Sequence, residues 1–242
     1  MRNLILPNTI TSISVCAFKG CSLLKELEIP SSVKEISYNA FEYCNSLTFY
    51  EYDNALYLGN KENHYHALIK IKSQDITTCK INDSCKVIAD GAFTDCKYLK
   101  EVSIPEGVYK IGGRTFEGCN NLEFIKIPNS VTGIGINAFK DCYSLKNIVI
   151  PENVEYIYEK AFESCRNLEN ITILSSNIRL SELLFLGCWN LKSITCEAKT
   201  PPSCENFGID VNKVILYVPK ESVELYESSK EYWPYIRNIV GK

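Results

Sequence analysis

Apolar residues recur along this chain with a period of 23 residues, and the same residue types return in the same columns. One unit begins with L-x-x-[LIV]-x-I, as in Leu145–Ile150, and continues with a proline, a valine and an isoleucine column. The unit closes with a small residue, a phenylalanine and, three positions later, a cysteine. The cysteine column contains Cys21, Cys44, Cys96, Cys119, Cys142, Cys165 and Cys188. Self-similarity at a fixed period of this length indicates a repeat architecture.

Each unit contains one short strand. Ile125-Lys126-Ile127 alternates with the two-residue period of a strand that buries one face. Pro128 follows it and cannot donate to a β ladder, so it ends the strand and turns the chain. Because 23 residues are too few to bury their own apolar face, successive units must stack, strand beside strand, about 4.8 Å apart. The pattern predicts a mainly β repeat solenoid.

The repeat resembles a known family. The consensus L-x-x-[IV]-x-I-P-x-x-V-x-x-I-x-x-x-A-F-x-x-C is similar to the BspA-type leucine-rich repeat of bacterial surface proteins, and Val131–Leu145 matches it at every defining position. The resemblance implies a right-handed leucine-rich-repeat coil of 23-residue units. It also implies an extracellular or cell-surface location and, for some members, attachment to host matrix proteins. A fold does not determine a function, so the partner stays open.

The period is interrupted once, where the cysteine spacing widens to 52 residues between Cys44 and Cys96. Two strand-like runs, Ala55–Leu58 and Ala67–Ile71, lie in this stretch and are joined by the turn-rich segment Gly59–Asn63, which indicates a β-hairpin. The chain after Cys196 departs from the pattern and resembles the end segment of BspA-type proteins. We therefore expect repeats over 1–48, a β-hairpin insert over 49–75, repeats over 76–196 and a C-terminal cap over 197–242.

Two interpretations of the aromatic insert are open. Exposed aromatic residues are typical anchors of protein interfaces, which makes Tyr57 and Tyr65 candidate partner-contact residues on a protruding surface. Alternatively, the hairpin packs its aromatic residues onto the adjacent coil as a spacer. His64 and His66 lie beside these tyrosines and are expected to be solvated loop residues.

The outward strand positions provide a second candidate surface. Phe124 and Val149 place apolar groups among polar neighbours, a mixture suited to protein contact. The neighbouring column alternates in charge from coil to coil and contains Lys100, Glu123, Lys146, Glu169 and Lys192. We expect this column to form a charge ladder that maintains the register of the stack.

The cysteines are expected to be small buried residues. Cys79, Cys85 and Cys196 occupy columns that elsewhere hold valine or isoleucine. These columns therefore require an apolar side chain of suitable volume and not the chemistry of sulfur. No pair has the C-x-x-C spacing of a metal or redox motif, and we expect no metal and no cofactor. Cys16 and Cys204 lie outside the apolar columns and are predicted to be exposed.

Charge and motif content exclude several function classes. With 26 Lys+Arg against 29 Asp+Glu the chain lacks the basic excess of a nucleic-acid-binding protein. The longest apolar run, Leu183–Trp189, is far shorter than the roughly 20 residues of a transmembrane helix. The motifs G-x-S-x-G, G-x-x-x-x-G-K-[ST] and H-E-x-x-H are absent, so no catalytic residue is assigned and an enzyme is not expected.

Met1 already stands in the first leucine column, while Leu4 and Leu6 occupy strand positions. This leaves no room for a signal peptide or an N-terminal cap, and indicates either a fragment of a longer protein or a first coil that pairs with something. The leading hypothesis for function is a binding or adhesion module that presents a rigid surface to a host or matrix protein, or to a glycan. The alternative is a structural spacer without a ligand of its own.

Overall fold

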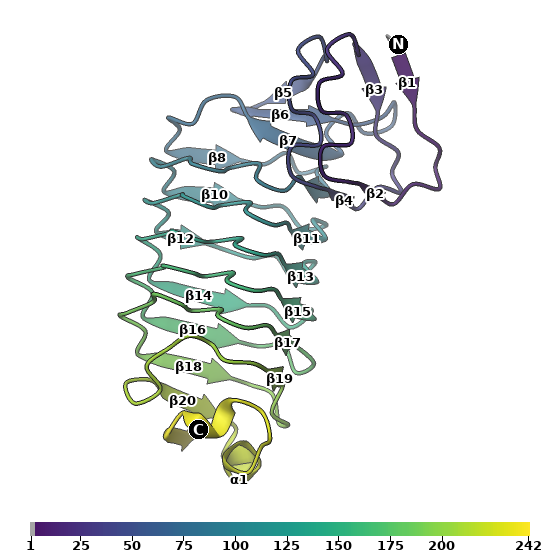
Figure 1. Cartoon of the computed structure of the whole chain (residues 1–242). Coiled ribbons are helices and arrows are strands. Elements are labelled where there is room, and N and C mark those ends of the chain that lie inside the picture. Colours follow the sequence, from purple (N-terminus) through teal and green to yellow (C-terminus); the bar gives the residue numbers. More distant parts are fainter. Residues whose placement is uncertain (1–2) are drawn as a thin grey trace.

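Each regular coil of the chain contributes one short strand to each of two sides of an elongated solenoid, here called the first and the second sheet (Figure 1). The pairing along the first sheet is not continuous, because no strand pairing joins residues 147–150 to the strand before them. The computed structural model describes residues 3–242, so Met1 and its place in the first leucine column lie outside the described residues. The first side of the solenoid contains β1 (Asn3–Ile5), β3 (Glu26–Glu28), β8 (Thr78–Lys80), β10 (Glu101–Ser103), β12 (Phe124–Ile125), β14 (Asn147–Ile150), β16 (Asn170–Ile173), β18 (Ser193–Cys196), β20 (Ile215–Val218) and β21 (Asn238–Gly241). The second side contains β2 (Ser12–Ile13), β4 (Glu35–Ile36), β9 (Val87–Ile88), β11 (Lys110–Ile111), β13 (Gly133–Ile134), β15 (Tyr156–Ile157), β17 (Arg179–Leu180) and β19 (Ser203–Cys204). The predicted mainly β repeat solenoid is confirmed.

The sequence period sets the register between coils. Ile148 pairs with Ile171, and Ile171 pairs with Ile194, so each residue lies beside its counterpart one unit away. Because a slip by one residue would turn every buried side chain outward, the alternation of the strands maintains this register.

The turn that contains the phenylalanine and the cysteine forms a second backbone ladder. The Phe116 amide donates to the Ala138 carbonyl at 2.8 Å, and the Phe139 amide donates to the Ala161 carbonyl at 2.8 Å. The cysteine thiol joins the same turns, since Cys142 Sγ donates to the Phe116 carbonyl at 3.2 Å. Each turn is therefore hydrogen-bonded to its neighbours through backbone and thiol.

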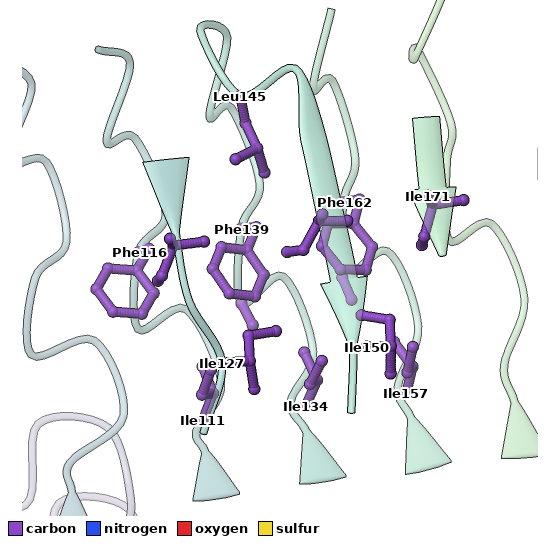
Figure 2. Packing of buried hydrophobic residues seen from close by; sticks show 14 of the residues in the cluster. Ile111, Phe116, Ile127, Ile134, Phe139, Leu145, Ile150, Ile157, Phe162 and Ile171 are labelled. Carbon is purple, nitrogen blue, oxygen red and sulfur yellow. The ribbon is translucent and has the colours of Figure 1, made fainter. Parts of the chain in front are cut away.

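The phenylalanine column forms the centre of the core. The rings of Phe116 and Phe139 stack with centroids 5.4 Å apart, and those of Phe139 and Phe162 with centroids 5.3 Å apart (Figure 2). All three side chains are fully buried, and the isoleucine columns line the same interior. Stacked identical rings leave no gap between coils, which gives the interior the close packing that folded proteins require.

The insert is a three-stranded antiparallel unit and not a hairpin alone. It contains β5 (Tyr50–Tyr52), β6 (Ala55–Leu58) and β7 (Ala67–Ile71), and β7 also pairs in parallel with β9. The predicted pairing of the second and third strands is confirmed, while β5 was not expected.

Strand β7 is buried on both faces and separates two cores. Ala67 and Ile69 pack with the N-terminal coils, whereas Leu68 and Ile71 pack with the long core of the remaining coils. The N-terminal coils consequently lie to one side of the main stack, and β1 and β3 run in a different direction from β8–β20 in Figure 1.

The C-terminal segment covers the last coil. It contains the 3-10 helices η1 (Lys220–Ser222) and η2 (Trp233–Tyr235) and the helix α1 (Val223–Glu227). Trp233 and Tyr226 are fully buried, with Trp233 Nε1 donating to the Pro202 carbonyl at 2.8 Å and the Tyr226 hydroxyl to the Ala198 carbonyl at 2.9 Å. Within the described residues, the helices are too short and too polar to cross a membrane.

Substituting Phe139 by alanine should lower the free energy of unfolding by about 3–5 kcal/mol, because the lost ring leaves a cavity between two stacked neighbours. Lys146→Ala on the exposed side of the same coil should cost less than ~1 kcal/mol. Urea unfolding of both variants followed by circular dichroism measures the difference. Equal losses for the two would show that the buried and exposed faces are assigned the wrong way round.

Candidate functional site

The outer face of the first sheet carries two exposed apolar side chains in the middle of the stack. Phe124 on β12 is 60% exposed and Val149 on β14 is 50% exposed. Alternate residues of these strands point outward, so both side chains lie on one face, on successive coils. The two strands that carry them are anchored in the core by the buried side chains of Ile125 and Ile148.

Polar side chains beside this apolar pair bond to one another. Asn170 Nδ2 donates to Asn147 Oδ1 at 2.8 Å, and the Ser193 hydroxyl donates to Asn170 Oδ1 at 2.8 Å. These residues share one outward column, because Asn147 pairs with Asn170 and Asn170 pairs with Ser193. The column is therefore an ordered and largely self-satisfied strip next to Val149.

The alternating charge column forms an ion pair at one step. Lys192 Nζ lies 2.7 Å from Glu169 Oε2, and this contact lowers the pKa of the Glu169 carboxyl. Along the rest of this column, within residues 3–242, no side-chain nitrogen lies within 4.0 Å of a carboxylate oxygen of the next coil. The register is thus maintained by backbone hydrogen bonds and by the buried columns of the core. The charge column contributes an ion pair at one step only.

The structure corrects the assignment of Tyr57 as a contact residue. Tyr57 is fully buried, its hydroxyl accepts a hydrogen bond from the Asn82 amide at 3.2 Å, and burial raises its pKa. Tyr65 is half-buried and meets the Tyr57 ring edge to face at 5.5 Å. The insert turns these rings toward the adjacent coil, which is the second of the two interpretations of the hairpin.

His66 differs from the expectation of a solvated loop residue, whereas His64 is exposed in the loop as expected. His66 is buried, and its Nε2 lies 3.0 Å from the Val33 carbonyl, which requires the ring to donate from that nitrogen. His64 stacks on Tyr50 with ring centroids 4.3 Å apart. His66 therefore links the insert to the second coil, and His64 packs within the insert against β5.

A further exposed cluster was missed by the sequence reasoning. The Arg166 guanidinium lies 4.7 Å from the Tyr143 ring and 5.4 Å from the Trp189 ring, and Trp189 is 74% exposed. The three residues follow Cys142, Cys165 and Cys188 directly, so they form one column at the repeat spacing. An alignment of the position after each repeat cysteine would have revealed this cluster. It lies on the side of the solenoid formed by the phenylalanine–cysteine turns.

The cysteines show two departures from expectation. Cys204 is buried rather than exposed, and burial raises its pKa to about 12. Cys21 is exposed, since it lies in the first coil at the end of the stack, and Cys16 is exposed as expected. The remaining repeat cysteines are buried, and no cluster of three or more metal-ligating side chains occurs within the described part of the chain.

Thiol labelling of the folded protein should modify Cys16 and Cys21 rapidly and the other cysteines slowly. The thiolate is the reactive form, and burial raises the pKa of both Cys85 and Cys96 to about 12. Reaction with a chromogenic disulfide reagent, followed by mass mapping, measures this, with urea-unfolded protein as the control in which all 12 should react. Rapid labelling of Cys204 in the folded state would contradict the burial described above.

The sequence matches a family described as BspA type leucine rich repeat region, with six copies over residues 1–72 and 70–192. Among curated proteins, none matches the chain.

Solved bacterial structures match the chain, and one of them has a TM-score above 0.5. The pneumococcal vaccine antigen PcpA is 23% identical with a TM-score of 0.63, and the match covers 100% of this chain and 68% of that one. A leucine-rich repeat protein from Bacteroides ovatus is 23% identical with a TM-score of 0.42, covering 99% and 65%. A leucine rich cell surface protein from Faecalibacterium prausnitzii is 23% identical with a TM-score of 0.36, covering 100% and 79%. The chain spans about two thirds of the length of the first two. At this identity the likeness concerns the fold alone.

Proposed function

Because the chain belongs to the BspA-type leucine-rich repeat family, we propose that it is a non-enzymatic binding module that presents the outer face of its first sheet to a protein partner. The observation that carries the proposal is the exposed pair Phe124 and Val149 on strands of successive coils, each anchored by a buried neighbour, Ile125 and Ile148. The family is a repeat scaffold of bacterial surface type, which supports interaction rather than catalysis as its role. On the same ground we propose a location at the bacterial surface or outside the cell.

The geometry of the sheet favours protein contact for an energetic reason. Side chains on paired strands are already ordered, so binding costs little additional conformational entropy. Phe124 supplies an aromatic anchor, and aromatic residues contribute disproportionately to interface energies. The side chains of Asn147, Asn170 and Ser193, which are hydrogen-bonded to one another, form a polar border beside this anchor. A partner with an apolar pocket bordered by polar groups would fit this surface.

Replacing Phe124 and Val149 together by serine should weaken binding to a protein partner at least about tenfold, because both apolar contacts are lost at once. Immobilised wild-type and variant protein should be tested against purified extracellular matrix proteins by biolayer interferometry. The exposed positions make the double variant compatible with folding, which circular dichroism checks.

Trp189→Ser is the matched control, since it removes an exposed aromatic from the side formed by the phenylalanine–cysteine turns and leaves the strand face intact. Loss of binding in this variant alone would move the site to the Tyr143–Arg166–Trp189 column. Equal binding by all three proteins would overturn the proposed face. Absence of binding even by the wild type across the matrix panel would favour the spacer alternative.

A further inference from the structure

A cleft of about 670 Å³ lies where the insert interrupts the stack. One wall is the turn of the second coil, over residues 37–45, and the opposite wall is the turn over 89–96. Residues of β7 and the ring of Phe49 line the space between them. Elsewhere in the stack, successive turns of this kind are hydrogen-bonded directly to each other.

The wall formed by the second coil carries three backbone donors without an acceptor. In the first coil, Cys16, Phe18 and Gly20 donate their amides to the next turn. Later in the stack, the residues at the same three positions do the same, namely Gly91, Phe93 and Asp95, then Arg114, Phe116 and Gly118, then Asn137, Phe139 and Asp141. The amides at these positions in the second coil belong to Asn39, Phe41 and Tyr43, and none has a hydrogen-bond acceptor among residues 3–242.

The pairing of β7 explains why these donors are unpaired. One edge of β7 is bonded to β6 and the other to β9, so its backbone has no free edge to offer to the second coil. The second coil packs instead against the face of β7 that carries Ile69. On the opposite wall the acceptors are partly taken, because the Ile71 amide donates to the Ala92 carbonyl at 3.1 Å and Gln74 Nε2 to the Thr94 carbonyl at 2.9 Å.

The charges around the cleft decide which ligand suits these donors. Glu42, Asp90 and Asp95 line it together with Lys70 and Lys72. The acidic groups would repel a phosphate or another free anion. The two lysines are engaged, since the ammonium of Lys70 lies 5.5 Å from the ring centroid of Phe49 and that of Lys72 lies 2.7 Å from the Glu51 carboxylate. Neutral carbonyl oxygens in a row are the acceptors that match three backbone amides at alternate positions.

We propose that this cleft binds a segment of a partner protein in the conformation of a repeat turn, which adds to the stack through its backbone. Three carbonyls of the segment accept hydrogen bonds from the Asn39, Phe41 and Tyr43 amides, as the carbonyls of a neighbouring turn do in the regular coils. An apolar side chain of the segment packs beside Phe41 and Phe49. Main-chain bonds supply affinity and the side-chain pocket supplies selectivity, which is the division of roles known from recognition by strand addition. The cleft volume lies within the roughly 300–1,000 Å³ typical of ligand sites.

Hydrogen exchange of the free chain provides the first test. The amides of Asn39, Phe41 and Tyr43 should exchange at least about tenfold faster than those of Gly91, Phe93 and Asp95, which are bonded in the next turn. Two-dimensional NMR on the full chain resolves the two sets. Equal protection of both sets would overturn the proposal, since the second-coil donors would then already have partners.

The second test uses a peptide with the sequence of residues 135–143, acetylated, amidated and with serine in place of Cys142. This segment is the chain's own turn, whose carbonyls accept from the equivalent amides of the preceding coil. Binding should slow exchange at Asn39, Phe41 and Tyr43 and at no equivalent position in the other turns. The same peptide with aspartate in place of Phe139 should bind at least about tenfold more weakly.

Thr94→Trp places a large side chain in the cleft and should reduce peptide affinity at least about tenfold. Lys140→Trp is the matched control, because it occupies the same column position in a turn whose two neighbours are regular turns, and should leave affinity unchanged. The Phe124→Ser, Val149→Ser double variant should also bind the peptide normally, which separates this site from the strand face. Failure of the peptide to bind, or protection of the three amides by inorganic phosphate alone, would refute a peptide site.

Discussion

The structure depends on the inability of a 23-residue coil to bury its own apolar face. Each coil is stable only between neighbours that place the same residue types at the same height, so the chain must maintain one register throughout. Backbone bonds along the strands and along the phenylalanine turns enforce that register together. The stacked rings of Phe116, Phe139 and Phe162 then fill the interior without gaps. Buried cysteines complete the turns, where their thiols donate to carbonyls of the preceding coil.

Within the stack, the insert changes the form of this packing. Strand β7 is paired on both edges and buried on both faces. One face packs in the core of the N-terminal coils, and the other packs in the long core of the remaining coils. The N-terminal coils pack on its face rather than on its edge, which turns the stack and separates two turns that would otherwise be hydrogen-bonded. A regular coil satisfies its own backbone groups through its neighbours. An irregular coil leaves groups such as the Phe41 amide available for a ligand.

The two proposed surfaces differ accordingly in what they offer. On the strand face around Phe124 and Val149, β12 pairs with β10 and β14 pairs with β16, and the outward side chains are what a partner would meet, so recognition there depends on side chains. The cleft beside the insert offers backbone donors and an apolar wall, so recognition there depends on the conformation of the bound segment. A module with both surfaces is able to contact a folded partner on one side and a turn-forming segment on another.

The periodic columns were enough to predict the solenoid, the first strand of each coil and the burial of most cysteines, because every regular coil meets the same neighbours. The second short strand of each coil was not predicted. The same reasoning failed for residues whose neighbours are unique. Tyr57 is an aromatic residue in a hairpin, and nothing in its local pattern shows that β7 and the coil of Asn82 enclose it. Cys204 looked peripheral, yet it lies on a buried strand position beside the C-terminal segment, where its amide donates to Glu231. The unpaired amides of the second coil were equally invisible, since they follow from the orientation of β7 and not from any residue type. In the repeats, the local sequence is sufficient to predict which residues are buried, because each coil packs against copies of itself. The packing of a unique segment is decided by contacts between residues far apart in the chain.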